Sequence, residues 1–248
     1  MLNYGLDMSE VDGDVVADLV AEGDELDALV AEHADWTRAT PAAGWTIAHQ
    51  VAHLAAADAG VVAAIRTPGT FDAVPRDADL DAAEGAAGPR SALLQTWRAG
   101  RAEVAAALRA LPADKSFPWF GADVTVQLMA PLRLMETWAH GQDVFDALDV
   151  RRPPTARLRH VAFLGVKGLT LSFHAAQLPV PAGPIRVELT GLDGEVWAWG
   201  PQDAPQRIDG TALDFCLRVT HRRSRAETGL TAVGADADTW LDVARVFL

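Results

Sequence analysis

The chain has 248 residues, of which 50% are hydrophobic and 22% charged, a balance typical of a folded globular protein rather than a disordered one. Its formal net charge of -13 makes nucleic acids and anionic membranes unfavourable partners, because their phosphates repel an acidic surface. The single cysteine, Cys216, excludes an internal disulfide bond, and the sequence shows neither a secretory signal nor a membrane-spanning apolar run, so a cytoplasmic protein is expected.

Helical periodicity dominates the first part of the chain. Apolar residues at helical spacing predict helices over residues 11–34, 47–65, 91–111, 125–147 and 155–176. Capping residues mark their starts: Ser9 or Asp12 for the first, Thr46 for the second and Ser91 for the third. The segment 66–90 is rich in Pro, Gly, Asp and Ala and predicts a long loop with one short helix.

Two features precede or interrupt the fourth helix. The sequence FPWFGA over 117–122 predicts an aromatic loop. Pro131 lies inside the helix, where we expect a kink or a restart, because proline removes one main-chain hydrogen bond.

The pattern changes after the fifth helix. A proline-rich connector over 177–184 precedes segments that alternate in the manner of strands. The elements predicted there are strands over 185–189, 195–199 and 206–208 and helices over 211–220 and 239–247. We therefore expect a domain boundary near Leu178, with a helical domain over 1–178 and a small α+β domain over 179–248.

Polar residues form one stripe on the otherwise apolar fourth helix. Arg133, Glu136, His140 and Asp143 recur at spacings of three and four residues, which places them on one face. Glu136 and His140 are one turn apart, so their side chains can meet at one point, and a carboxylate with an imidazole suits zinc, nickel or iron. A polar stripe also arises when a helix simply faces solvent, and the spacing alone leaves both interpretations open.

The second helix offers a matching histidine. His49 and His53 are one turn apart, and either could complete a His–Glu–His set if the second and fourth helices pack side by side. Three protein ligands would leave a coordination position open for water or substrate, as in catalytic rather than structural sites.

Longer motifs resemble a known family. The segment from Thr40, TPAAGWTIAHQVAHLAAAD, resembles the start of the second helix in the DinB-like superfamily and, within it, the mycothiol-dependent maleylpyruvate isomerase group of actinobacteria. Other segments resemble a narrower actinobacterial subfamily of metal-binding proteins. They are WFG, RLMETWAHGQDVFDAL, RLRHVAFLGV, RVELTGLDGEVWAWGP, GTALDFCLRVTHRR and GADADTWLDVA. The resemblance covers nearly the whole chain. It implies a mainly α fold: a DinB-like four-helix bundle of the up-down-down-up type, followed by a small C-terminal α+β domain that is sterol-carrier-like.

The resemblance also implies a site. In the superfamily one divalent ion is held by a histidine of the second helix and a carboxylate–histidine pair of the later helix. By position, these ligands are His53, Glu136 and His140. In the isomerase group an arginine of the C-terminal module reaches the metal site, and the candidates here are Arg222 and Arg223.

The function that the resemblance implies is that of a metal-dependent isomerase or thiol S-transferase acting on a small-molecule substrate. The ion, zinc before nickel or iron, would activate a thiol, with mycothiol as cosubstrate, or a water. A metal-dependent hydrolase or lyase that uses no thiol, and a non-enzymatic protein that binds a metal or a small ligand, remain alternatives.

Five further residues are candidates for the same site. Asp143 could accept a ring N–H of His140 or only carry a solvent-facing charge. Arg133 could neutralise a substrate carboxylate or pair with Glu136. Trp45, Trp119 and Phe120 could line the mouth of the pocket or pack in the core in the ordinary way.

Overall fold

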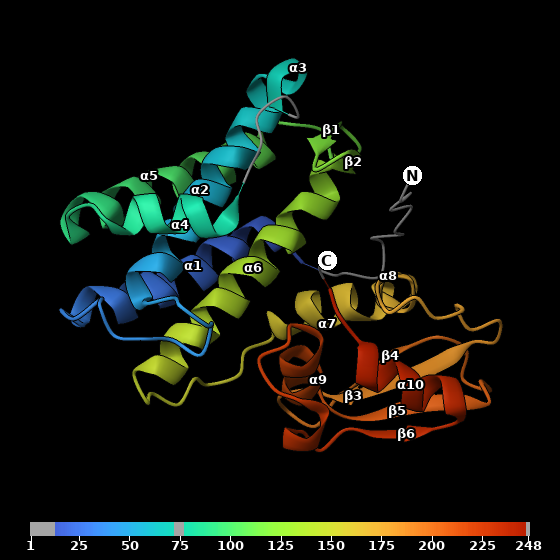
Figure 1. Ribbon diagram of the computed structural model, residues 1–248. Coiled ribbons are helices and arrows are strands. Elements are labelled where there is room, and N and C mark those ends of the chain that lie inside the picture. The colour runs from blue at the N-terminus through green and yellow to red at the C-terminus, as the bar shows by residue number, and fades with distance from the viewer. Residues whose placement is uncertain (1–12, 72–76, 247–248) are drawn as a thin grey trace. The chain divides into compact units, whose positions relative to one another are not determined.

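The computed structural model describes residues 13–71 and 77–246 (Figure 1). The chain divides into two compact units, Met1–Arg152 and Pro153–Leu248, called the helical unit and the sheet unit below. The fold is mainly α with a small α+β part at the C-terminal end, as predicted. None of the helices in the described ranges is long and apolar enough to cross a membrane.

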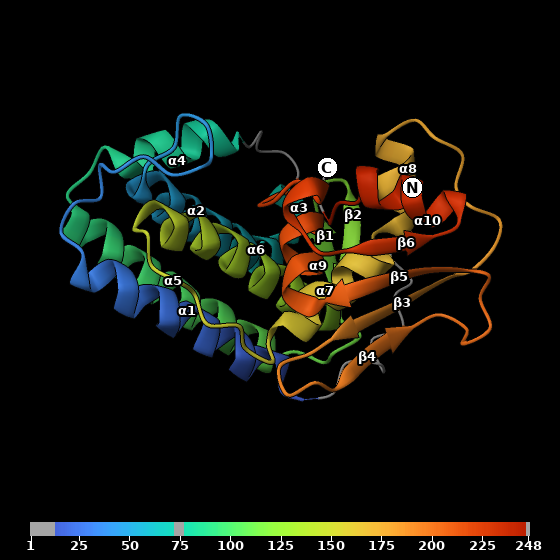
Figure 2. The same cartoon turned by 90° about the horizontal axis from the view of Figure 1, so that it is seen from below.

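The helical unit is built around four long helices. They are α1 (Val15–Glu32), α2 (Ile47–Arg66), α5 (Arg90–Arg109) and α6 (Val126–Ala147). The shorter elements are α3 (Pro68–Phe71), α4 (Ala78–Ala86), β1 (Ser116–Trp119) and β2 (Ala122–Thr125). Helices α1 and α2 each pack against both α5 and α6, and α4 covers α2 (Figure 2). The contact between α2 and α6 is the one that matters for the site.

The starts of the helices follow local capping chemistry. Thr46 precedes α2, as predicted, and the carboxylate of Asp14 accepts the main-chain N–H groups of Val16 and Ala17 at the start of α1. The predicted caps Ser9 and Asp12 lie outside the described residues.

A β-hairpin stands where we predicted an aromatic loop. Strands β1 and β2 pair antiparallel from Ser116 with Thr125 to Trp119 with Ala122. The two turn residues, Phe120 and Gly121, have φ angles of 47° and 78°, the left-handed values that a two-residue hairpin turn of the primed type needs. Helix α6 follows directly and runs through Pro131 as one helix.

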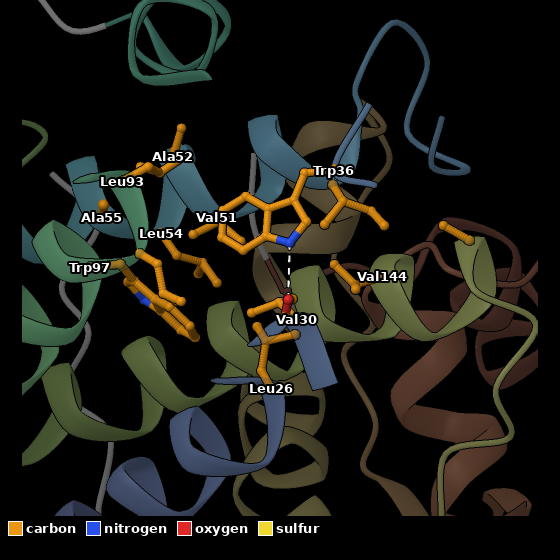
Figure 3. Close-up of a cluster of buried hydrophobic side chains, with 13 residues drawn as sticks. Leu26, Val30, Trp36, Val51, Ala52, Leu54, Ala55, Leu93, Trp97 and Val144 are labelled. Atoms are coloured by element: carbon orange, nitrogen blue, oxygen red, sulfur yellow. Dashed lines mark hydrogen bonds between the residues drawn. The ribbon is translucent and has the colours of Figure 1, made fainter. Parts of the chain in front are cut away.

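The core of the bundle is a cluster of buried aliphatic and aromatic side chains from α1, α2, α5 and α6 (Figure 3). Trp97 is 1% exposed and packs with Leu54 and Leu26, which are both fully buried. Trp36 is also buried, and its indole N–H donates to the carbonyl of Val30 at 3.0 Å, so its polar atom is satisfied.

One carboxylate joins α1 to α5. Asp27 accepts from Nη2 of Arg98 at 2.6 Å and from Nη2 of Arg101 at 2.9 Å. Burial raises the pKa of Asp27, but the hydrogen bonds and charges of the two arginines outweigh it and hold the pKa below its ordinary value. A carboxyl whose pKa is lower in the folded state stabilises the protein above its unfolded pKa, and this stabilisation is lost as the pH falls through the folded pKa.

The substitution Asp27→Asn is therefore expected to lower the free energy of unfolding by about 2 kcal/mol at neutral pH. The difference in the free energy of unfolding between this variant and the unsubstituted protein should shrink in acid, because Asp27 itself becomes protonated there. Urea denaturation of both proteins from about pH 7 to about pH 2 measures it. Asp24→Asn is the control, since the Asp24 side chain is 62% exposed and its pair with Arg101 should contribute little. A difference that persists undiminished in acid would contradict the ionic explanation.

The end of the helical unit is held by Arg152. Its guanidinium donates to the carbonyl of Trp138 at 2.7 Å and to Glu25 at 3.2 Å, and it bonds the fully buried carboxylate of Glu22. The same guanidinium lies 5.0 Å from the ring centre of Phe145. Arg152 therefore belongs to the helical unit although it lies beyond the end of α6.

The sheet unit has four α-helices, one short 3-10 helix (Arg225–Glu227) and four strands within its described residues. The α-helices and strands are α7 (Leu158–Lys167), α8 (Leu169–Ala175), β3 (Ile185–Thr190), β4 (Val196–Trp199), β5 (Gln206–Thr211), α9 (Ala212–Val219), β6 (Thr231–Val233) and α10 (Ala235–Val243). The strand order is β4-β3-β5-β6, with β3 parallel to β5 and the other neighbours antiparallel. Val187, Trp197 and Ile208 point from the strands into the core of the unit.

The division of the chain falls after Arg152 rather than near Leu178. The reason is that α7 and α8 pack within the sheet unit: α7 lies on α9, and α8 lies on α10. The predicted helix over 155–176 is also broken in two at Gly168, where a Cβ atom would lie 2.6 Å from the carbonyl oxygen of Arg245. The last helix begins at Ala235, four residues before its predicted start.

Candidate metal centre

Helices α2 and α6 bring three potential ligands to one point. His53 comes from the middle of α2, and Glu136 and His140 come from successive turns of α6. One ligand atom from each of the three lies within 4.8 Å of the others. Nε2 of His53 is 3.5 Å and Nε2 of His140 is 3.3 Å from Oε2 of Glu136. The side chains are 17%, 15% and 26% exposed for His53, His140 and Glu136, so the point where they meet is sheltered but reachable.

These separations suit a shared ion better than direct hydrogen bonds. A hydrogen bond between an imidazolium and a carboxylate is about 2.7–2.9 Å long. Ligands about 2.0–2.1 Å from a tetrahedral zinc ion lie roughly 3.3–3.4 Å from one another. The distances from Glu136 to the two histidines fall close to the second value, so the donor set and its spacing fit a small divalent cation.

Electrostatics keep the carboxylate charged. Burial raises the pKa of Glu136, but the contacts with the imidazoles of His140 and His53 and the nearby charge of Arg133 outweigh it and hold the pKa well below its ordinary value. Glu136 is therefore an anion at neutral pH, the form that ligates a metal.

A buried amide supports His140 from behind. Oε1 of Gln50, on α2, lies 2.6 Å from Nδ1 of His140, and Nε2 of Gln50 donates to Oγ1 of Thr40 at 2.9 Å. Thr40 in turn donates to the carbonyl of Trp45 at 3.0 Å. Asp143, which the spacing suggested for this role, lies 4.0 Å from Nδ1 of His140, so Gln50 holds the closer position.

Gln50 is absent from our sequence-based candidates, although the sequence carries a signal for it. Ile47, Val51 and Leu54 form the buried face of α2, and Gln50 lies on that face and is itself fully buried. A polar side chain in a buried position needs a hydrogen-bond partner, and His140 on the facing helix supplies one.

Trp45 lies directly against the two histidine rings. Its ring centre is 5.3 Å from that of His53 and 5.8 Å from that of His140, and the second pair is stacked. Its indole N–H donates to Asp79 of α4 at 2.7 Å. The structure thus places Trp45 beside the candidate centre, with its ring orientation fixed by α4.

The other histidine of the second helix has a capping role. Nδ1 of His49 lies 3.3 Å from the main-chain nitrogen of Thr46, which donates to it, and 2.8 Å from the Thr46 hydroxyl oxygen. This contact closes the first turn of α2. His49 is not part of the cluster of potential ligands found in the described chain.

Arg133 forms a buried ion pair close to the site. The residue is 2% exposed, and its Nε donates to Oδ1 of Asp58 on α2 at 3.2 Å. The direct partner of Arg133 is thus Asp58, in a buried ion pair between α6 and α2, and its charge also acts on Glu136. A role for Arg133 in binding a substrate carboxylate stays a prediction.

The two other aromatic candidates lie on the hairpin. Trp119 stacks on Phe71 of α3 with ring centres 5.3 Å apart, and Phe120 contacts both rings edge to face. Phe120 is 65% exposed. These contacts place Trp119 and Phe120 in a small aromatic cluster with Phe71 of α3.

The arginine candidates follow α9 in the sheet unit. Arg222 donates to the carbonyl of Thr220 at 2.8 Å, and Arg223 donates to the carbonyl of Arg222 at 2.7 Å. Arg223 lines a pocket of about 530 Å³ whose other charged or ionisable lining residues are Arg218, His221, Arg225, Asp242 and Arg245. Arg222 does not line this pocket, so the two adjacent arginines lie in different surroundings.

Comparisons with known proteins agree with this architecture. The family model described as the mycothiol maleylpyruvate isomerase N-terminal domain matches residues 19–145, and one described as wyosine base formation matches residues 181–232. Two uncharacterized proteins, from two strains of Mycobacterium tuberculosis, are each 46% identical over 245 residues, 95% of this chain and 95% of their own.

Two solved structures share the fold. The crystal structure of the mycothiol-dependent maleylpyruvate isomerase matches with a TM-score of 0.62 at 16% identity, and a mutant of that isomerase, with alanine in place of one histidine, matches with the same TM-score at 15% identity. Each match covers 94% of this chain and 95% of the other. At such low identity the likeness shows a common fold.

Proposed function

The chain belongs to the family of the mycothiol maleylpyruvate isomerase N-terminal domain, and from this membership we propose that it is a metal-dependent enzyme of the isomerase or thiol S-transferase type. One divalent ion, zinc before nickel or iron, would be held by His53, Glu136 and His140. The thiol would be mycothiol and the substrate a small electrophile. The observation that carries the proposal is the convergence of three ligand atoms from two helices within 4.8 Å.

The ion and the residues around it would have separate roles at such a centre. A divalent ion at this place lowers the pKa of a thiol or a water that binds to it, so that a nucleophile is available at neutral pH. With such an ion bound, Glu136 would supply one negative charge and the two imidazoles neutral donors, so the centre would keep a net positive charge that favours an anion. Three protein ligands leave a position open for the thiol or the substrate. Trp45 packs against both imidazole rings on one side.

Arg222 and Arg223 are the candidates for binding a substrate carboxylate. Arg223 is the stronger candidate of the two, because it lines a pocket with three other arginines and Arg222 does not. A guanidinium suits a substrate carboxylate, which it can bind through two parallel hydrogen bonds.

Removing the metal tests the proposed function directly. The protein treated with a chelator is expected to lose at least about 100-fold of its rate of mycothiol-dependent isomerisation of maleylpyruvate, and added zinc should restore the rate. Mycothiol at about 100 times its Kd should stabilise the zinc-loaded protein by roughly 2.7 kcal/mol in thermal unfolding, and the chelated protein much less.

Three results would separate the alternatives. Zinc-dependent stabilisation and turnover that do not respond to mycothiol would favour a hydrolase or lyase without a thiol. Turnover that survives complete metal removal, verified by elemental analysis, would refute the metal-dependent mechanism. Retained zinc without turnover of any electrophile tested would favour a binding protein.

A further inference from the structure

We propose that Gln50 is a positioning residue that holds the proton of the neutral His140 ring on Nδ1, so that Nε2, the ring atom nearest to Glu136, keeps the lone pair that can bind a metal ion. The inference rests on the proposed function only in taking the bound species to be a metal ion. The tautomer of His140 is a property of the protein without the ion. Gln50 contacts the ring at Nδ1, whereas the potential ligand atom of His140 nearest to Glu136 is Nε2.

The direction of the hydrogen bonds follows from an acceptor that cannot change. The main-chain carbonyl of Trp45 only accepts, so the Thr40 hydroxyl donates to it at 3.0 Å. The Thr40 oxygen then accepts from the amide nitrogen of Gln50 at 2.9 Å. This turns the amide oxygen of Gln50 toward His140, and an oxygen at 2.6 Å from Nδ1 requires a proton on Nδ1. A neutral imidazole with Nδ1 protonated has its lone pair on Nε2.

The opposite amide orientation loses a hydrogen bond. With the amide turned over, the Thr40 hydroxyl would face the Gln50 oxygen and the Trp45 carbonyl together, and its single proton could serve only one of them. The observed chain from His140 through Gln50 and Thr40 to Trp45 satisfies every member. A fully satisfied buried chain of hydrogen bonds is rigid.

The burial of Gln50 strengthens its effect on the His140 tautomer. Gln50 is fully buried, so solvent does not compete for the His140 ring on that side. Gln50 also lies three residues before His53 on α2, so one helix supplies both a potential ligand and the support for the ligand on the facing helix. The direct acceptor is a neutral amide rather than the carboxylate that often holds metal-binding histidines, and the carboxylate of Asp143, 4.0 Å from Nδ1, is too distant for a direct hydrogen bond.

Three variants and a matched control test the role. Gln50→Met keeps the size and removes the acceptor, Gln50→Glu keeps an acceptor oxygen, and Thr40→Val removes the anchor of the amide. Gln142→Met is the control, because Gln142 lies on α6 and its amide donates to Asp146 rather than to the His140 ring. The measurements are the zinc Kd by chelator competition and the ring tautomer of His140 by long-range proton–nitrogen NMR of the metal-free protein.

Gln50→Met is expected to weaken zinc binding by about 10–100-fold and to shift His140 toward the Nε2-protonated tautomer. Gln50→Glu and Gln142→Met should stay near the unsubstituted protein in both measurements, and Thr40→Val should show a smaller change in the same direction as Gln50→Met. The proposal is overturned if folded Gln50→Met shows an unchanged His140 tautomer. If Gln50→Met does not fold, an unchanged tautomer in folded Thr40→Val overturns it instead. If the unsubstituted protein binds no zinc while the tautomer still responds to Gln50→Met, the metal function fails and the role of Gln50 stands.

Discussion

Replacing His140 with alanine is expected to weaken zinc binding by more than about 100-fold, because loss of a direct ligand exceeds the 10–100-fold cost of losing an outer hydrogen-bond partner. The substitution removes one of the three atoms that converge within 4.8 Å and one of the two ligands that α6 provides. His53→Ala should have a similar effect, since it removes the ligand from α2. Elemental analysis after dialysis against a zinc buffer measures the metal bound per chain.

The neighbouring histidine gives a matched control for this experiment. His49 lies one turn before His53 on the same helix, but its ring caps the start of α2 through Thr46. His49→Ala should keep the full metal content, with at most a small loss of stability from the missing cap. Full metal content in folded His140→Ala, or its loss in folded His49→Ala, would show that the ligands are not those named here.

Replacing Asp58 with alanine is expected to lower the free energy of unfolding of the helical unit by about 3–5 kcal/mol, because it leaves the buried charge of Arg133 without its partner. Both side chains are almost inaccessible, at 7% exposure for Asp58 and 3% for Arg133. Urea denaturation followed by tryptophan fluorescence measures the loss. The surface pair of Arg38 and Asp149 is the control, and Arg38→Ala should cost less than about 1 kcal/mol.

A double substitution separates charge from packing in the same experiment. Asp58→Leu with Arg133→Met removes both charges and keeps most of the volume, so it should recover a large part of the stability lost in Asp58→Ala. A double variant as unstable as Asp58→Ala would show that shape rather than an unpaired charge governs this contact.

The sequence was sufficient for elements whose chemistry is local. The long apolar periodicity predicted α2 and α6 to within a residue or two, and Thr46 and Thr125 lie at the predicted starts of these helices. Strands β3 and β4 also lie where the alternating pattern placed them. The spacing of Glu136 and His140 put them on one face, and only the resemblance to a family favoured His53 over His49.

The elements that we did not predict depend on contacts distant in the sequence. Gly168 interrupts the fifth predicted helix because the chain near Arg245 passes too close for a side chain. The hairpin from Ser116 to Thr125 was missed because Phe120 occupies a left-handed turn position where Asn or Asp is the usual signal. The pairing of Arg133 with Asp58 was not predicted, because it depends on how α2 and α6 are aligned against each other, and neither helix sequence alone determines that alignment.

The position of Arg152 has a practical consequence for dissecting this protein. A shortened chain that stopped at Ala147, the last residue of α6, would discard the guanidinium that the fully buried Glu22 binds, along with its bonds to Glu25 and Trp138. An excision or fusion junction therefore belongs after residue 152, in front of Pro153 and Pro154, and not at the visible end of the helix.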